Sequence, residues 1–528
     1  MSQKRKAKTQ IPLNTLSATA YTDQAGAAPN KRSKLSKPVA EASKSEKKAG
    51  SRDRADKAVV TQGRGGIEHQ DEVVQEFDHS RPEEKAGIVD KRFYPAEMSN
   101  ERCAMYNADE IPRPMERLKT ALEETKDVRE GIRLGDAGEA VVHWFKRDLR
   151  IRDNTGLGKA SRLAKEKGVG VIGLWIMSPQ DWEAHLVSPA KCDFELRSVV
   201  ILQQELAALD IPLYIETIMP REEVPNRLME LAQEWGVKNI FCNIEYEPDE
   251  LRREENLIRS GAAKGINFEP CDDDCVVPPG SLKTGTGRQY AVYSPWYRAW
   301  VAYLHTHPDL LNERPSPEKN PAGFRNKFEH LFACDTPEAP DSKALAREEK
   351  ERYSRLWPAG EAAALDRLNL FLTEKIGRYI ATRNFPAQQS TASVSVHHAA
   401  GTLAARTSVR MARDVNSTKK LDGGIEGIKG WIGEVAWRDF YRHVLVNWPY
   451  VWYVHSIRLS ISGTVIPMLI FYSMNKPFKY EYTNIDWEYN DDHFQAWTEG
   501  KTGTLHLLSS SVPCFRIPFN ISISTWAS

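Results

Sequence analysis

Cysteine is scarce in this chain, with seven among its 528 residues. The seven cysteines are Cys103, Cys192, Cys242, Cys271, Cys275, Cys334 and Cys514. They form no paired framework, which fits a protein of a reducing compartment. Cys271 and Cys275 have no second cysteine pair or histidine cluster nearby, so we expect no metal site.

The sequence also has no secretory signal and no membrane span. Its N-terminus is polar from the first residues. The formal net charge is zero, yet residues 1–60 contain 14 lysines or arginines and 5 acidic residues, an excess of nine positive charges. Residues 1–110 are rich in Lys, Ala, Ser, Glu and Gln, and contain few aromatic residues. Such a composition predicts a disordered basic tail.

Two basic segments in this tail, Lys4 to Lys6 and Pro29 to Leu35, are typical of nuclear import signals. The alternative is a solvated basic arm that adds weak, salt-sensitive affinity for DNA. The first 20 residues are basic and hydroxyl-bearing without an acidic residue, so a mitochondrial address stays open as well. We expect a nuclear location, with the mitochondrion as a second one.

Strands and helices alternate in the next part of the chain. Apolar runs predict strands, and 3.6-residue periodicity predicts helices between them. The strands are expected at Val141 to Phe145, Val169 to Ile176, Pro212 to Ile215 and Asn239 to Cys242, and the helices at Lys191 to Leu209 and Val224 to Trp235. This rhythm indicates an α/β domain over 138–275, built on a doubly wound parallel sheet. No G-x-G-x-x-G follows the first strand, which argues against a dinucleotide site there.

The pattern then becomes helical. A linker is expected over 276–341, because Pro308 to Asp341 is rich in proline, asparagine and charge. The clearest helices beyond it are Ala362 to Ile380, Val394 to Asp414 and Ile428 to Val446. An all-α domain is therefore expected over 342–503.

The most informative run is GWIGEVAWRDFYRHVL, Gly430 to Leu445. On a helix, Trp431, Glu434 and Arg438 share one face, because they lie three or four residues apart. Aromatic rings beside charged hydrogen-bonding groups suit a surface that stacks on flat rings and holds their polar edges. The alternative is a half-buried helix in which Glu434 and Arg438 form an ordinary i,i+4 ion pair.

Together with AVVHWFKRDLRIRDNTGL, Ala140 to Leu157, this run resembles the signature of the DNA photolyase/cryptochrome family. The resemblance extends from Ala140 to Tyr450, returns from Met474 to about Gly503, and is nearest to fungal class I members that act on cyclobutane pyrimidine dimers. It implies an α/β antenna domain, a partial helical FAD-binding domain, and light-dependent repair by electron transfer from excited reduced FAD. DNA with pyrimidine dimers would be the partner of a monomeric protein.

The resemblance also implies roles for individual residues. Residues matching flavin contacts are Tyr379, Thr391, Ser393, Ser395, Trp431, Glu434 and Arg438. Residues matching DNA or lesion contacts are Arg383, Glu434 and Trp437, and the catalytic set is Glu434, Trp437 and Trp487, the last as the outer member of a tryptophan chain. Two positions differ from relatives: Ser393 stands where bacterial members often have Arg, and Gly433 where others have Asn or Ser. Ser390 to Ser395 could alternatively be a helix-capping cluster.

An accessory pigment is implied for the α/β domain. His185, Asp249 and Glu250 match positions that contact a folate, 5,10-methenyltetrahydrofolate. A flavin or deazaflavin pigment stays open, as does the reading of Glu250 as an ordinary surface charge.

Two segments depart from the family. Trp452 to Ser473 interrupts the motif, and its possible codons contain splice-donor and splice-acceptor sequences, so we interpret it as a translated intron. Its apolar part is too short to span a membrane. Residues 504–528 form an aberrant tail in place of the family's continuation. A flavin is held by enclosure, so we expect this chain to bind flavin poorly and to have little activity. The alternatives to light-dependent repair are a cryptochrome-type blue-light signalling protein on the same fold and a non-catalytic DNA-binding fragment.

Overall fold

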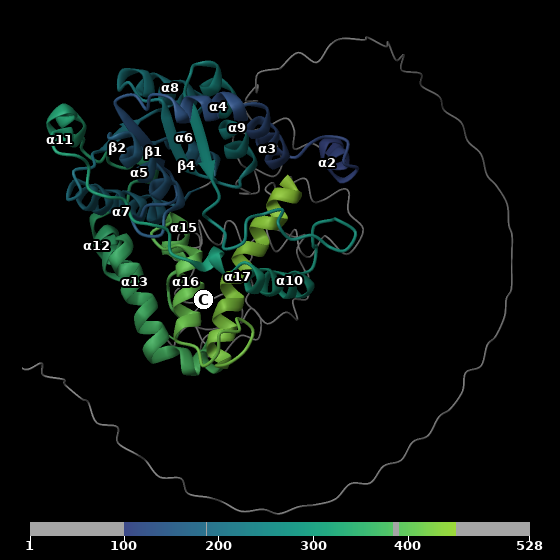
Figure 1. Ribbon diagram of the computed structural model, residues 1–528. Helices are drawn as coiled ribbons and strands as arrows, with labels where there is room; N and C mark the ends of the chain where they lie inside the picture. The colour runs from purple at the N-terminus through teal and green to yellow at the C-terminus, as the bar shows by residue number, and fades with distance from the viewer. Residues whose placement is uncertain (1–99, 186, 384–389, 450–528) are drawn as a thin grey trace, which may run out of the picture. The chain divides into compact units, whose positions relative to one another are not determined.

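The computed structural model describes residues 100–185, 187–383 and 390–449, all of which belong to one compact unit (Figure 1). Within it, an α/β region is followed by a helical region, as the sequence predicts. No helix of the described residues combines the length and apolar character needed to cross a bilayer.

The α/β region is built on a five-stranded parallel sheet with the order β3-β2-β1-β4-β5. The strands are β1 (Ala140–Phe145), β2 (Gly170–Met177), β3 (Leu213–Thr217), β4 (Asn239–Asn243) and β5 (Asn267–Cys271). The first four confirm the predicted strands to within two residues. Every residue of β1 is buried, which is typical of a parallel strand covered on both faces.

Helices cover both faces of this sheet. Alternation along β1 sends Val141 and Phe145 into one apolar cluster, and Val142 and Trp144 into another. The first cluster includes side chains of α5 (Thr155–Lys167) and α7 (Pro189–Ala207), and the second includes side chains of α3 (Pro114–Glu124), α8 (Val224–Glu234) and α9 (Pro248–Ala263). The doubly wound fold is thus confirmed. The order in which strands are added to the sheet reverses between β1 and β4, where ligands of such folds usually bind.

Helices also precede β1. They are α2 (Asn100–Asn107), α3 and α4 (Lys126–Leu134). Tyr106 lies in the apolar core of the helical region, whereas Met115 and Leu118 of α3 lie in that of the α/β region. Ordered structure therefore begins before residue 110, where the sequence placed the end of the tail.

The helical region is built around α17 (Glu426–Asn447). Its other helices are α10 (Tyr293–Thr306), α12 (Arg347–Leu356), α13 (Gly360–Leu370), α14 (Tyr379–Thr382), α15 (Ser395–Ala400) and α16 (Ala405–Asp414). The short helices α6 (Pro179–Ala184) and α11 (Phe324–Lys327) belong to the α/β region, where Phe324 of α11 lies in the apolar core. Trp296 and Trp300 of α10 are fully buried beside α17, so the range 276–341 contributes to the core and is more than a linker.

Two predicted helices are interrupted. Between α13 and α14 the backbone passes through a π-helical segment, Phe371–Lys375, and a 3-10 turn, Ile376–Arg378. The helix expected over Val394 to Asp414 is split by Gly401, whose φ is 72°. A Cβ at Gly401 would lie 1.9 Å from the carbonyl oxygen of Arg147, so only glycine allows this close approach to the loop after β1.

Candidate active site

Helix α17 carries Trp431, Glu434, Trp437 and Arg438, which we call the α17 site. Apolar residues such as Ile432, Val435 and Phe440 bury the opposite side of the helix in the core. Glu434, Trp437 and Arg438 are half-buried, and Trp431 is buried. Three of the four side chains therefore stay partly accessible, because their helix positions face away from the core.

The Trp431 ring lies among aromatic residues of the segment between α13 and α14. Its ring centre is 5.0 Å from that of Phe371 and 6.2 Å from that of Tyr379. The side chain is 5% exposed, yet its indole Nε1 has no hydrogen-bond partner among the residues that the structure describes. A buried donor without a partner costs folding free energy, so such groups are usually retained for a ligand or a function. The predicted flavin contacts Tyr379 and Trp431 thus lie together around an unused donor.

Glu434 forms an ion pair with Arg383. The Arg383 guanidinium also lies 5.6 Å from the centre of the Tyr379 ring. Both side chains of the pair are 16% exposed. The ion pair therefore connects Glu434, the predicted lesion contact, with Arg383, the predicted contact to a DNA phosphate.

The Trp437 ring is stacked on Tyr293, the first residue of α10. Their ring centres are 3.5 Å apart and their planes differ by 7°. The Tyr293 hydroxyl donates a hydrogen bond of 2.8 Å to the carbonyl oxygen of Gly433. Sequence reasoning missed Tyr293 because it lies in the range assigned to the linker. The helical spacing of Tyr293, Trp296 and Trp300 was the signal that could have found it.

Arg438 binds Asp274, which follows β5. One guanidinium nitrogen donates to the Asp274 carbonyl oxygen over 2.5 Å, and another pairs with its carboxylate. Burial raises the pKa of Asp274, but the guanidinium groups of Arg438 and Arg442 outweigh this and lower it overall. Arg438 therefore connects α17 to the α/β region. Because Glu434 pairs with Arg383, both charged residues of the α17 site have a partner outside their own helix.

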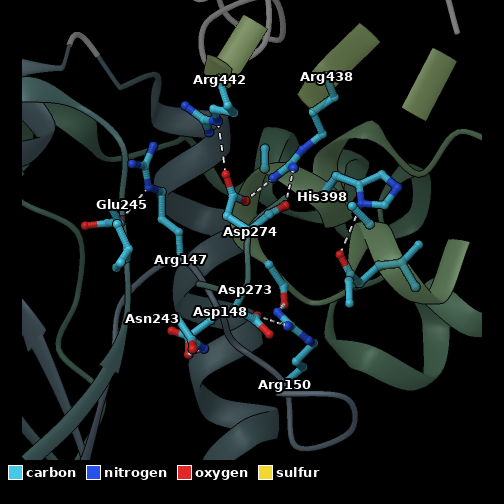
Figure 2. Close-up of a pocket in the computed structure, with 16 residues that line it drawn as sticks. Arg147, Asp148, Arg150, Asn243, Glu245, Asp273, Asp274, His398, Arg438 and Arg442 are labelled. Atoms are coloured by element: carbon cyan, nitrogen blue, oxygen red, sulfur yellow. Dashed lines mark hydrogen bonds and ion pairs between the residues drawn. The ribbon is translucent and has the colours of Figure 1, made fainter. Parts of the chain in front are cut away.

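Figure 2 shows the cavity at this junction, about 470 Å³ including the part open to solvent. Its walls come from both regions and carry Arg147, Arg150, Arg438 and Arg442 opposite acidic side chains. A buried ion-pair network lies next to it: Arg406 of α16 pairs with Asp153 at 2.8 Å and with Asp273 at 2.9 Å, while Arg150 also pairs with Asp273. These paired charges fix α16 to the loops that follow β1 and β5.

The hydroxyl side chains predicted to hold flavin phosphates lie at the start of α15. Ser393 has a φ of 52°, and its hydroxyl is 3.5 Å from that of Thr391. The N-cap of α15 is Val394, with no side-chain cap bond, so Ser395 is the first residue of the helix. Helix capping therefore does not account for these hydroxyls. They are available to a ligand, although a helix of this length adds little by its dipole.

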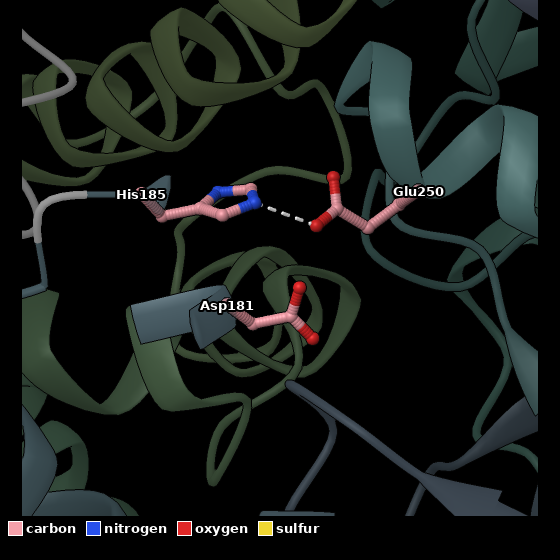
Figure 3. A group of neighbouring side chains, drawn as sticks. All are labelled: Asp181, His185 and Glu250. Atoms are coloured by element: carbon pink, nitrogen blue, oxygen red, sulfur yellow. Dashed lines mark ion pairs between the residues drawn. The ribbon is translucent and has the colours of Figure 1, made fainter. Parts of the chain in front are cut away.

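The predicted pigment contacts form a buried ionic cluster at the edge of the α/β region (Figure 3). His185 Nε2 lies 2.7 Å from a Glu250 oxygen and 3.1 Å from an Asp249 oxygen. Arg221, which the sequence did not suggest, pairs with Asp249 at 2.7 Å and with Asp181 at 2.8 Å. Glu250 is 3% exposed, so it is not the ordinary surface charge considered above.

The same cluster has the donor set of a metal site, since ligand atoms of Asp181, His185 and Glu250 lie within 4.8 Å of one another. However, the guanidinium groups of Arg221 and Arg253 both pair with Asp181. Their positive charges oppose a bound cation, so we interpret the cluster as an ion-pair network.

A second cavity, about 730 Å³ including its open part, adjoins this cluster at the carboxyl ends of β1 and β2. Its walls include the indole rings of Trp144, Trp175 and Trp182, together with His185 and Glu250. The cavity lies beside the point where the strand order reverses. It combines aromatic surface with charged groups, as a site for a flat polar molecule would.

Several predicted features lie outside the described residues. They are Trp487, the basic segments of the tail, the interruption at 452–473 and the residues from 504 onward. Their assignments remain predictions.

These features define a class of protein in which a doubly wound α/β region is joined to a helical region with an aromatic and charged site for flat molecules. Two family models match the chain: DNA photolyase over residues 141–318, and FAD binding domain of DNA photolyase over residues 431–505. The second match begins at Trp431 of the α17 site.

Two curated relatives agree with these matches. A deoxyribodipyrimidine photo-lyase of Neurospora crassa is 51% identical over 80% of this chain and 65% of its own length. A mitochondrial deoxyribodipyrimidine photo-lyase of Saccharomyces cerevisiae is 28% identical over 79% of this chain and 71% of its own. A class III photolyase structure from Agrobacterium tumefaciens has a TM-score of 0.48 and 22% identity, over 59% of this chain and 60% of that one.

The chain belongs to the DNA photolyase family, and its residues 431–505 match the family's FAD-binding domain. It spans about two thirds of the length of the curated relatives, 65% in the case of the Neurospora protein.

Proposed function

We propose that this chain repairs cyclobutane pyrimidine dimers in DNA in a light-dependent reaction with FAD. The observation that carries the proposal is the α17 site, where a half-buried ring and a carboxylate lie beside a cluster of buried aromatic rings. The family matches and the names of the relatives support the same reading. No observation among the described residues favours blue-light signalling or passive DNA binding over repair.

The residues present fit a flavin, because the buried Trp431 Nε1 has no hydrogen-bond partner within the described part of the chain, and the rings of Phe371 and Tyr379 lie beside it. Trp431 and Tyr379 would hold the cofactor, and the hydroxyls of Thr391, Ser393 and Ser395 would bind its phosphates. The guanidinium of Arg438, fixed by Asp274, would lie at its polar edge. When bound and reduced, FAD supplies the light-driven electron that opens the dimer ring.

The other steps are performed by side chains. A dimer weakens base pairing, so turning it out of the helix costs less than turning out intact bases. Arg383 would bind a phosphate beside it, and the Trp437 ring would pack against the extruded bases. Glu434 would hydrogen-bond or protonate their polar edge. The protein therefore contributes position, charge and a proton.

The test is a light-dependent repair assay on the full chain. Purified protein is scanned for a bound flavin spectrum and then illuminated with an oligonucleotide that contains one thymine dimer. We expect loss of the dimer in light only, and a loss reduced by about 10²-fold or more in Glu434→Gln, since general acid catalysis is typically worth that much. Bound flavin far below stoichiometry, or equal dimer loss in darkness, would overturn the proposal.

A folate antenna pigment, 5,10-methenyltetrahydrofolate, is proposed for the cavity beside His185. Indole rings of Trp144, Trp175 and Trp182 could stack on a pterin, and the Glu250 carboxyl could bond its polar edge. Adding the pigment to the purified chain should produce a near-ultraviolet absorption band that Glu250→Ala weakens. A band that Glu250→Ala leaves unchanged would exclude this site.

We further propose a monomeric protein that reaches the nucleus through its basic N-terminal segments, with a mitochondrial fraction as the name of the yeast relative suggests. A fluorescent fusion of the full chain tests this, compared with a variant whose Lys31, Arg32 and Lys34 are changed to Ala. An unchanged nuclear signal in that variant would contradict the import role.

A further inference from the structure

Tyr293 makes two contacts with α17 that its position in the sequence does not suggest. Its ring lies flat on Trp437, and its hydroxyl bonds the Gly433 carbonyl oxygen at 2.8 Å. The ring is also stacked on Tyr297, with centres 5.5 Å apart. Tyr293 is thus held between its own helix and the α17 site.

Gly433 directly precedes Glu434 on α17, and as a glycine it places no side chain beside the Glu434 carboxylate. A Cβ placed at Gly433 would have a single neighbouring atom within 4 Å, the Tyr293 hydroxyl oxygen at 3.8 Å. The hydroxyl therefore occupies the space beside Gly433 that a short polar side chain there would occupy. Burial, with charge repulsion from Tyr297 and Glu434, raises the pKa of Tyr293, so the hydroxyl keeps its proton and remains a donor.

Stacking decides what the Trp437 ring can do. A half-buried indole can usually adopt more than one rotamer, but a parallel partner 3.5 Å away restricts it to one plane. A ring in a fixed plane can bind other flat rings without first losing conformational entropy.

We propose that Tyr293 is a positioning residue for the recognition of damaged bases: it holds the Trp437 ring in its binding plane and supplies the polar group that Gly433 lacks. This rests on the proposed function, because the ligand is a pair of linked pyrimidines. The hydroxyl and the ring contribute separately, and substitutions can separate them.

The first measurement is binding in the dark, by fluorescence anisotropy, of an oligonucleotide with one thymine dimer and of the same oligonucleotide undamaged. Tyr293→Phe keeps the ring and should lower the ratio of the two affinities roughly threefold to tenfold, the worth of about one hydrogen bond. Adding Gly433→Ser to that variant restores a hydroxyl at the same place and should recover most of the ratio. Tyr293→Leu removes the ring as well and should lower the ratio further.

Tyr297→Phe is the matched control. Tyr297 lies one turn further along α10, and its buried hydroxyl has no hydrogen-bond partner among the described residues. Loss of the Tyr297 hydroxyl should leave the ratio of the affinities for damaged and undamaged DNA unchanged. An increased ratio in Tyr293→Leu would mean that Tyr293 occupies the place of the lesion, and would overturn the proposal. Equal ratios in wild type and Tyr293→Phe would overturn the role of the hydroxyl.

The second measurement needs no DNA. The full chain is labelled with 5-fluorotryptophan, and the ¹⁹F signal of Trp437 is assigned by its loss in Trp437→Phe. We expect one sharp signal in wild type and Tyr293→Phe, and a shifted or broadened signal in Tyr293→Leu. If wild type did not distinguish damaged from undamaged DNA, the proposed function would fail, whereas this signal would still decide the positioning role. An unchanged signal in Tyr293→Leu would overturn it.

Discussion

Arg383 and Glu434 form an ion pair although 51 residues separate them in the chain. The first is the predicted contact to a DNA phosphate, and the second is the predicted contact to the lesion. In the absence of DNA each neutralises the other. A phosphate must therefore compete with Glu434 for Arg383, and the lesion must compete with Arg383 for Glu434.

The first prediction concerns this competition. Glu434→Gln removes the negative partner of Arg383, whose positive charge is then available to DNA. The dark affinity for undamaged DNA should rise about twofold to fivefold at low salt, and the slope of log affinity against log salt should steepen by roughly 0.9. Fluorescence anisotropy at several salt concentrations measures both.

Arg383→Gln should have the opposite effect, with weaker binding and a shallower salt slope. Lys429, exposed on the same helix beside Glu426, offers a control, because Lys429→Gln removes a charge outside the pair. If Glu434→Gln weakened binding to undamaged DNA, Arg383 and Glu434 would not compete with a phosphate in this way.

Much of the fold could be predicted because hydrophobic periodicity reports directly on burial. The predicted helix Ile428 to Val446 and the strand Val141 to Phe145 both agree closely with α17 and β1. Gly401 shows the limit of such patterns. It ends a helix because a distant carbonyl approaches it, and a contact between distant segments leaves no periodic signal.

The candidate site, like the fold, could be predicted only where local helical spacing determines it. Helical spacing correctly placed Trp431, Glu434 and Arg438 close together on α17. Their partners could not be foreseen, since Asp274 and Tyr293 come from segments more than a hundred residues away, as the bonds from Arg438 and to Gly433 show. A side chain's own helix restricts its direction, but tertiary packing selects its partner.

The second prediction concerns the buried ion pairs of Arg406. This side chain is 2% exposed and binds both Asp153 and Asp273. Arg406→Met should lower the free energy of unfolding by about 3–5 kcal/mol, because it leaves carboxylates buried with fewer partners. Arg413→Met on the same helix, whose arginine pairs with an exposed Asp414, should change it by less than about 0.5 kcal/mol. Urea unfolding followed by circular dichroism measures both, and equal effects would contradict the structural role of Arg406.

The third prediction concerns pH. Burial, with the nearby Asp249 carboxylate, raises the pKa of Glu250 to about 7. Burial lowers the pKa of His185, but Glu250 and Asp249 outweigh it and raise that pKa overall. Burial raises the pKa of Asp249, but His185 and Arg221 hold it well below its usual range, so Asp249 stays ionised near neutral pH.

Between pH 4 and 7 the folded chain therefore keeps a proton on Glu250 that the unfolded chain has released. The contribution of Glu250 to the free energy of unfolding should therefore decrease as pH rises through this range, by at most about 1.4 kcal/mol per pH unit for one proton. His185 extends the decrease above pH 6.5. Glu250→Gln should flatten the profile between pH 5 and 7, as measured by thermal unfolding. A profile with the wild-type slope in that variant would contradict the assignment.

The last prediction compares two buried indoles of the helical core. Trp300 Nε1 donates to an Asp439 oxygen at 3.1 Å, whereas Trp431 Nε1 has no hydrogen-bond partner in residues 100–185, 187–383 and 390–449. Trp300→Phe should lower the free energy of unfolding of the flavin-free chain by about 2–3 kcal/mol, because a buried carboxylate loses a donor. Trp431→Phe loses no such bond, so its cost should be smaller and limited to the volume removed. Its flavin affinity should nevertheless fall about tenfold in a titration followed by fluorescence, if the indole N–H is kept for the cofactor. Equal destabilisation by the two substitutions, with flavin affinity unchanged in Trp431→Phe, would place Trp431 in the core alone.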